Sequence, residues 1–179
     1  MRFKARDTFS VALFSALTAI GAFILIPLPF SLVPITLQTL FTYMAGGLLG
    51  GYLGALSQLI YILIGISGLP VFASGSAGPS VLVGPTGGYL VGFVAGAFVI
   101  GNMAEARSSS SFMWLLTCMI VGTTTIYTLG VIQLMNWMKI GLAEAVITGV
   151  LPFIVGDALK ILLAAYTTHR IRRMLPELT

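Results

Sequence analysis

Charged side chains are scarce in this sequence, and their scarcity decides the class of protein. Lys and Arg together number nine and Asp and Glu five among 179 residues, so that 8% of the chain is charged while 58% is hydrophobic. A soluble domain has about a quarter of its residues charged. A chain with so few charges could not cover its surface against water, and we therefore expect an integral membrane protein covered by the lipid bilayer.

Histidine and cysteine are nearly absent, which argues against an enzyme. The only histidine, His169, lies in the basic segment "THRIRR", so no base stands beside a nucleophile inside the membrane and no cluster of metal ligands is available. The single Cys118 excludes a disulfide framework. No lysine follows the Gly-rich "GPTGG" at 84–88, so a phosphate-binding loop is missing too. We expect no catalytic residue, no metal, no cofactor and no ATP-driven transport by this chain alone.

Long apolar runs fill the rest of the chain. A transmembrane helix takes about 20 residues, and the apolar runs divide into six segments, at residues 8–28, 37–49, 52–66, 87–103, 111–135 and 151–171. The basic start "MRFKARD" is compatible with a secretory signal, but the first run has full membrane length and further runs follow it. The sequence therefore predicts an all-α protein with six transmembrane helices, the first of them retained.

The basic residues predict the orientation of these helices. Of the basic residues outside the spans, only Lys139 falls in a connection on one side, whereas the other side carries Arg2, Lys4, Arg6, Arg107, Arg170, Arg172 and Arg173. By the positive-inside rule both termini are cytoplasmic, and the net charge of +4 gives no support for a nucleic-acid partner. Three long connections, 29–36, 67–86 and 136–150, then lie outside. The uncharged, Gly- and Pro-rich connection 67–86 is expected to form a folded cap.

Two opposite charges interrupt the last span. In "LPFIVGDALK" the residues Asp157 and Lys160 are three positions apart, which places them on one face of a helix. Ionisable residues inside a membrane are costly and face the protein interior. They are either a self-neutralising pair that fixes helix packing or a polar clamp on a ligand. Their position in the outer half of the span, near the external connections, favours the clamp.

Other side chains could complete such a ligand site. A carboxylate only accepts and an ammonium only donates hydrogen bonds, so the pair suits a solute with N–H donors beside a carbonyl. A small-molecule pocket is mostly apolar, with a few placed polar groups. The candidate polar residues are Gln38, Ser74, Ser76, Thr86 and Tyr89, and the candidate apolar and aromatic walls are Phe30, Tyr43, Tyr61 and Phe72.

Small residues predict where helices approach closely. Two sets of glycines at every fourth position, 46, 50 and 54 and then 88, 92 and 96, are interpreted as packing faces within the chain. In the first predicted helix Ala12 and Ala16 form one small-xxx-small pair, and Ser15 and Ala19 form a second. From the spacing alone, this helix packs equally well against the protein's own helices or against another subunit.

Four segments in order along the chain resemble the BioY family, the biotin-specific S components of energy-coupling factor (ECF) transporters. They are "VPITLQTL" (33–40), "GLPVFA" (68–73), "GPTGGYLVGF" (84–93) and "LPFIVGDALK" (151–160). The resemblance implies a single transmembrane substrate-binding domain over 1–179, with the six-helix S-component fold, in the cytoplasmic membrane of a prokaryote. It also implies high-affinity binding of biotin from outside. Uptake is then driven by an ECF module of one transmembrane coupling subunit and two ATPases.

The resemblance also assigns roles to residues. Asp157 is expected to accept from a ureido N–H of biotin and Lys160 to donate to an oxygen of the ligand, while Ala12 and Ala16 match the family's A-x-x-x-A motif that docks on the coupling subunit. Because 67–86 contains no Arg or Lys, the biotin carboxylate is left to backbone N–H groups, Ser74, Ser76 or Lys160. The alternatives are an S component for another small vitamin, a stand-alone ion-coupled biotin carrier and a purely structural membrane subunit.

Overall fold

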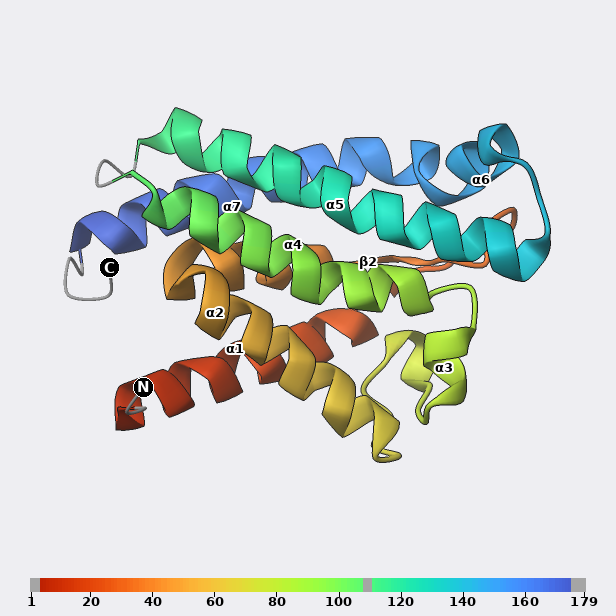
Figure 1. The fold of residues 1–179 in the computed structure, drawn as a ribbon, viewed down its shortest axis with the longest axis horizontal. Coiled ribbons are helices and arrows are strands. Elements are labelled where there is room, and N and C mark those ends of the chain that lie inside the picture. Colours follow the sequence, from red (N-terminus) through yellow and green to blue (C-terminus); the bar gives the residue numbers. More distant parts are fainter. Residues whose placement is uncertain (1–3, 108–110, 175–179) are drawn as a thin grey trace.

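The computed structural model describes residues 4–107 and 111–174, and nearly all of their regular structure is helical. Figure 1 shows the start of α1 and the end of α7 at one end of the molecule and α3 and α6 at the other. A two-residue antiparallel pairing, β1 with β2, is the one departure from the all-α prediction in this part of the chain. The helices are α1 (Ala5–Phe23), α2 (Gln38–Ile66), α3 (Ser80–Val83), α4 (Gly87–Glu105), α5 (Phe112–Met138), α6 (Leu142–Gly149) and α7 (Ile154–Met174), with 3-10 turns η1 (Ala73–Gly75) and η2 (Leu151–Phe153) and strands β1 (Leu25–Ile26) and β2 (Ile35–Thr36).

Helix α2 reverses direction at Gly50. This residue has φ 83° and ψ 179° inside the helix, a conformation that is essentially confined to glycine. Contacts pair the two halves about this point: Gln38 with Tyr61, Thr42 with Gln58, and Gly46 with Gly54. The predicted segments 37–49 and 52–66 are therefore the two arms of a helical hairpin. Each arm is shorter than the roughly 20 residues that span a bilayer core.

Helix α4 packs against this hairpin and against α5 through glycines, as the stripes predicted. A Cβ on Gly46 would come within 2.6 Å of the Ala97 carbonyl oxygen of α4, and one on Gly92 within 2.9 Å of the Ile126 Cα of α5. These backbones approach too closely for any larger residue. The buried core, which includes Tyr43, Ile100 and Met119, lies between α2, α4, α5 and α7.

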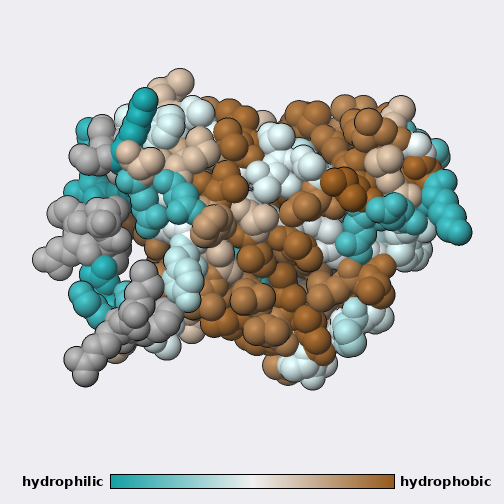
Figure 2. Space-filling model, viewed as in Figure 1, coloured by the Kyte–Doolittle hydropathy of each residue, from teal (hydrophilic) through white to brown (hydrophobic). Residues whose placement is uncertain are grey.

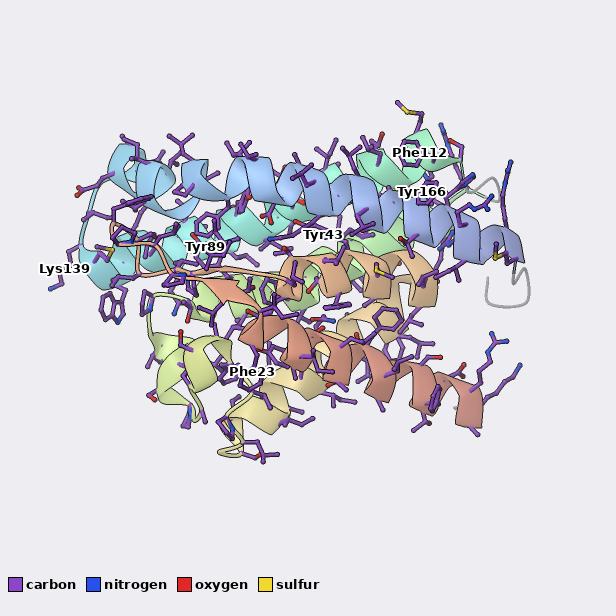
Figure 3. The ribbon with its side chains drawn as sticks, turned by 180° about the vertical axis from the view of Figure 1, so that it is seen from behind. Phe23, Tyr43, Tyr89, Phe112, Lys139 and Tyr166 are labelled. Atoms are coloured by element: carbon purple, nitrogen blue, oxygen red, sulfur yellow. The ribbon has the colours of Figure 1, made fainter. Side chains whose placement is uncertain are left out.

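Four helical stretches in the described part of the chain are long and apolar enough to cross a membrane: Gln38–Ile66, Gly87–Glu105, Phe112–Met138 and Leu142–Met174. Figure 2 shows hydrophobic side chains over the middle of one face, with hydrophilic residues toward its two ends. Figure 3 places Phe112 near the end where α7 finishes and Lys139 at the opposite end. Lys139 is thus separated from the other basic side chains, as the charge pattern predicts, although Arg2 lies outside the described residues.

The predicted end of the first span is wrong. The first span was expected to run over 8–28, but α1 ends at Phe23, and Leu25–Ile26 pairs with Ile35–Thr36 instead. Two prolines at 27 and 29, which lack an N–H and restrict the residues before them, account for the early end of the helix. The connection 136–150, predicted only as a long external connection, contains the end of α5 and the helix α6. The cap 67–86 is folded as expected, around η1 and α3.

A buried hydrogen-bond network joins α1 to both arms of the α2 hairpin. The Gln58 amide nitrogen donates to the Thr18 hydroxyl at 3.2 Å and to Ser57 Oγ at 3.1 Å, and its oxygen accepts from the Thr42 hydroxyl at 3.2 Å. All four side chains are fully buried. Because no water competes for these groups, their hydrogen bonds fix how α1 sits on the hairpin.

We expect Gly50→Ala to destabilise the protein by about 1–3 kcal/mol, because alanine cannot readily adopt the required φ and its Cβ would overlap the Glu105 carboxylate. The matched control is Gly156→Ala in α7, where the nearest atom to a new Cβ is 3.9 Å away. Thermal unfolding in detergent should show a lower melting temperature for the first variant only. Equal melting temperatures for the two variants would contradict the assigned role of Gly50.

Candidate ligand-binding site

A cavity of about 500 Å³ lies beneath the cap 67–86. This is a volume typical of small-molecule sites. Its wall is formed by β2 and the start of α2, the cap, the first turns of α4, one face of α5, η2 and the start of α7. Most of the lining is apolar, including Val33, Leu90, Phe93, Ile126, Trp137 and Phe153.

Asp157 and Lys160 form an ion pair on the wall of this cavity. The Lys160 Nζ lies 2.7 Å from Asp157 Oδ1, and the two residues are only 7% and 3% exposed. The two charges therefore neutralise each other, and both line the cavity. Because they are three residues apart, in the first two turns of α7, they share one face of the helix, and this face is turned to the cavity.

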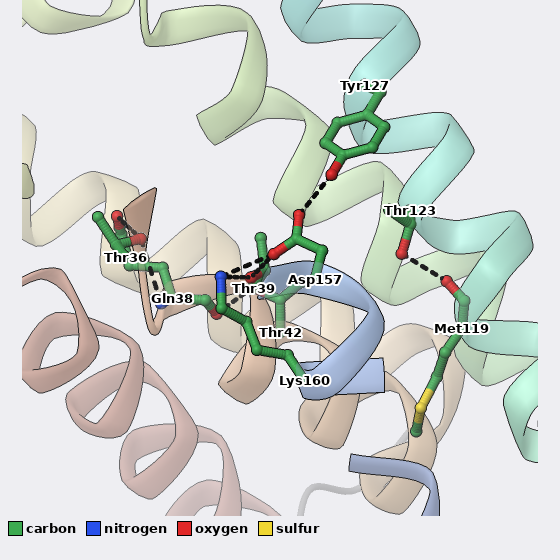
Figure 4. A network of polar contacts seen from close by, with 9 residues as sticks. All are labelled: Thr36, Gln38, Thr39, Thr42, Met119, Thr123, Tyr127, Asp157 and Lys160. Atoms are coloured by element: carbon green, nitrogen blue, oxygen red, sulfur yellow. Dashed lines mark hydrogen bonds and ion pairs between the residues drawn. The ribbon is translucent and has the colours of Figure 1, made fainter. Parts of the chain in front are cut away.

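Two hydroxyl groups complete the surroundings of the ion pair, as Figure 4 shows. Thr39 of α2 donates to Asp157 Oδ1 at 3.1 Å and accepts from the Lys160 ammonium at 3.2 Å. Tyr127 of α5 donates to Asp157 Oδ2 at 2.6 Å. Removing two charges from water costs several kcal/mol per ion unless additional hydrogen bonds satisfy them. The hydroxyls from α2 and α5 supply those bonds.

Most of the sequence-predicted site residues meet at the cavity. Besides Asp157 and Lys160, those that line it are Gln38, Phe72, Ser74, Ser76, Thr86 and Tyr89. The other predicted wall residues lie elsewhere. Tyr43 is fully buried in the core, Tyr61 is buried behind the wall, and Phe30 is 63% exposed.

Tyr61 acts on the cavity through its neighbours. Its hydroxyl accepts from the Gln38 amide at 2.6 Å and donates to the Val71 carbonyl at 3.1 Å, while its ring meets that of Phe72 edge to face at 5.6 Å. It thereby orients a polar cavity residue and ties down the start of the cap. Gln133 of α5 holds the end of the cap, donating to the carbonyls of Leu82 and Gly84 at 2.6 and 2.7 Å.

Sequence reasoning missed Thr39 and Tyr127. Thr39 directly follows the predicted Gln38, so its place at the end of "VPITLQT" was an available signal. Tyr127 had no comparable signal, because threonines surround it on α5 and give the helix no single polar face. Three of them donate their hydroxyl hydrogen to a backbone carbonyl four residues earlier in the helix: Thr124, Thr125 and Thr128.

The two small-residue pairs of α1 face in different directions. Ala12 and Ala16 are exposed, as are Phe9, Leu13 and Ile20 beside them, whereas Ser15 is buried and Ala19 is half-buried. The first pair therefore lies on the outer surface of the described chain, and the second faces the protein's own helices.

The fold places the protein in the class of ECF-transporter S components. It superposes on a crystal structure of the S-component for biotin from an ECF-type ABC transporter with a TM-score of 0.88 and 29% sequence identity, over 96% of this chain and 95% of that chain. The sequence profile of the BioY family matches residues 1–177. The chain belongs to the BioY family.

Relatives within this family are similar along nearly their whole length. The biotin transporter BioY of Thermotoga maritima is 42% identical, over 94% of this chain and 97% of its own. The probable biotin transporter BioY of Pyrococcus horikoshii is 41% identical, over 94% and 98%. Family membership confirms the prediction of a membrane transport protein rather than an enzyme.

We expect Lys160→Met to destabilise the protein by about 3–5 kcal/mol, because it leaves the buried Asp157 carboxylate without a cation. The double variant Asp157→Asn, Lys160→Met removes both charges and should recover most of this loss. Chemical unfolding of ligand-free protein in detergent measures both effects. Equal losses in the single and the double variant would show that charge imbalance is not the cause.

Proposed function

We propose that this protein is the biotin-binding S component of an ECF-type ABC transporter. The observation that carries the proposal is the Asp157–Lys160 pair on the wall of a capped cavity of about 500 Å³, in a chain whose relatives are biotin transporters. The bicyclic head of biotin carries two N–H donors and one carbonyl on its ureido ring. Asp157 accepts from an N–H and Lys160 donates to the carbonyl oxygen.

The far end of the site holds the biotin carboxylate in this proposal. The hydroxyl of Ser76 already donates to the Ala73 carbonyl at 2.8 Å, whereas Ser74 lines the cavity in a left-handed conformation with φ 60°. Strained backbone of this kind clusters at ligand sites. Ser74 and neighbouring backbone N–H groups therefore take the carboxylate, while Gln38, Phe72, Thr86 and Tyr89 shape the space between.

The membrane arrangement follows from the charge pattern. The chain crosses the cytoplasmic membrane of a prokaryote six times as one transmembrane substrate-binding domain, with both termini in the cytoplasm and the cap outside. The two arms of α2 together with α1, α4, α5 and α7 make the six crossings. The exposed Ala12 and Ala16 dock on the coupling subunit of an ECF module, whose two ATPases supply the energy.

A stand-alone carrier driven by proton uptake at Asp157 is less consistent with the geometry. The carboxylate already accepts from an ammonium and two hydroxyls, so a transported proton would have to compete with these donors for its oxygens. A biotin-linked pH change in liposomes lacking any ATPase would favour the carrier instead. Tight binding of a different vitamin by the purified protein, without tight binding of biotin, would identify another substrate.

We expect Asp157→Asn to weaken biotin binding by about ten- to a hundred-fold, the loss expected for a hydrogen bond to a charged group. Glu144→Gln is the matched control, because Glu144 is exposed on α6 and does not line the cavity. Equilibrium binding of biotin to the purified variants measures the difference. Equal losses of biotin affinity in the two variants would show that Asp157 is not part of the proposed site.

We expect Ala12→Trp and Ala16→Trp to leave biotin binding intact and to abolish uptake in the presence of an ECF module. Both residues are exposed and distant from the cavity lining, and a bulky side chain prevents close helix approach. Leu162→Trp, on the exposed face of α7, is the control and should transport normally. Unchanged uptake by both alanine variants would refute the docking assignment.

A further inference from the structure

The Asp157 carboxylate has few hydrogen-bonding positions left for a ligand. A carboxylate offers about four lone-pair positions, two on each oxygen. Oδ1 accepts from Lys160 at 2.7 Å and from Thr39 at 3.1 Å, and Oδ2 accepts from Tyr127 at 2.6 Å. Within the described chain, one acceptor position of Asp157, on Oδ2, therefore has no hydrogen-bond donor in these contacts, and Asp157 lines the cavity.

The Lys160 ammonium is limited in the same way. It has three N–H donors, of which one goes to Asp157 Oδ1 and one to the Thr39 hydroxyl at 3.2 Å. The Thr39 hydroxyl gives its own hydrogen to Oδ1 and so can only accept from the ammonium. One N–H of Lys160 is left for a ligand.

The count of free positions points to a role for the two hydroxyls. We propose that Tyr127 and Thr39 are positioning residues that leave the ion pair one acceptor and one donor, so that it recognises a single N–H and C=O edge of the ligand. The proposal rests on the proposed function and deepens it, since one edge of a cyclic urea, amide or carbamate carries this pair of groups.

The placement of the two hydroxyls supports this role over a simple packing role. Thr39 comes from α2 and Tyr127 from α5, while both charges come from α7. Thr39 is hydrogen-bonded to both members of the ion pair. Tyr127 donates to Oδ2, the carboxylate oxygen that neither Thr39 nor Lys160 contacts. The carboxylate is therefore held at both oxygens, and its free position has a fixed direction, which lowers the ordering cost of binding.

Removing the Tyr127 hydroxyl should weaken only ligands that use the free position on Oδ2. We expect Tyr127→Phe to weaken biotin binding by about ten- to a hundred-fold. Tyr166→Phe is the matched control, because Tyr166 is exposed on α7 and outside the cavity lining, and its biotin affinity should change by less than about two-fold.

Two biotin analogues separate positioning from a general structural effect. In each lactam analogue one ureido N–H is replaced by CH2 while the carbonyl that faces Lys160 is kept. The wild-type protein should bind one lactam nearly as well as biotin and the other much more weakly. Tyr127→Phe should weaken biotin and the first lactam by the same large factor and the second by less than about two-fold.

Variants of Thr39 test the proposal even if the Tyr127 variant does not fold. Thr39→Ser keeps the hydroxyl and should bind biotin as the wild type does, whereas Thr39→Val is close in shape, lacks the hydroxyl and should lose about ten-fold or more. Equal weakening of both lactams by Tyr127→Phe, or equal affinity of the two Thr39 variants, would overturn the positioning roles. No tight biotin binding by the wild type would instead refute the proposed function itself.

Discussion

The contact between Asp157 and Lys160 is the interaction on which the arrangement of the cavity depends. Two charges in an apolar bundle are tolerated only where other groups complete their hydrogen bonds, and here those groups come from α2 and α5. The ion pair of α7 thus determines how three helices face one another. The same demand for polar partners produces a site, because the positions left unfilled are open to a solute beneath the cap.

Composition and periodicity were sufficient to predict the membrane class and the helical fold and to single out the two charges of the last span, because these features follow from local chemistry. The two arms of the α2 hairpin were also predicted, because two short apolar runs flank Gly50. The predicted end of α1 was wrong because two prolines and the pairing of β1 with β2 end the helix before the apolar run ends. Tyr43 and Tyr61 were placed on the cavity wall because a sequence cannot show which side of a buried ring faces a space. Tyr127 was missed because the rotation of α5 depends on tertiary contacts.

Residues outside the cavity also contribute to its shape. Tyr61 holds Gln38 and the start of the cap, and Gln133 holds the end of the cap through two backbone carbonyls. The cap contains no charged residue, so its closure depends on such neutral hydrogen bonds and on the packing of Phe72 against Gly65.

The network centred on Gln58 connects the exposed helix α1 to the wall of the cavity. Thr18, Gln58 and Thr42 are fully buried, and breaking their bonds in an apolar surrounding gains no hydrogen bonds with water. Helix α1 is therefore tied to both arms of the α2 hairpin, and the joined helices carry Ala12 and Ala16 on the outer surface and Gln38 and Thr39 on the cavity wall. A force applied to α1 from outside would therefore reach the cavity wall through Gln58 and the first turn of α2.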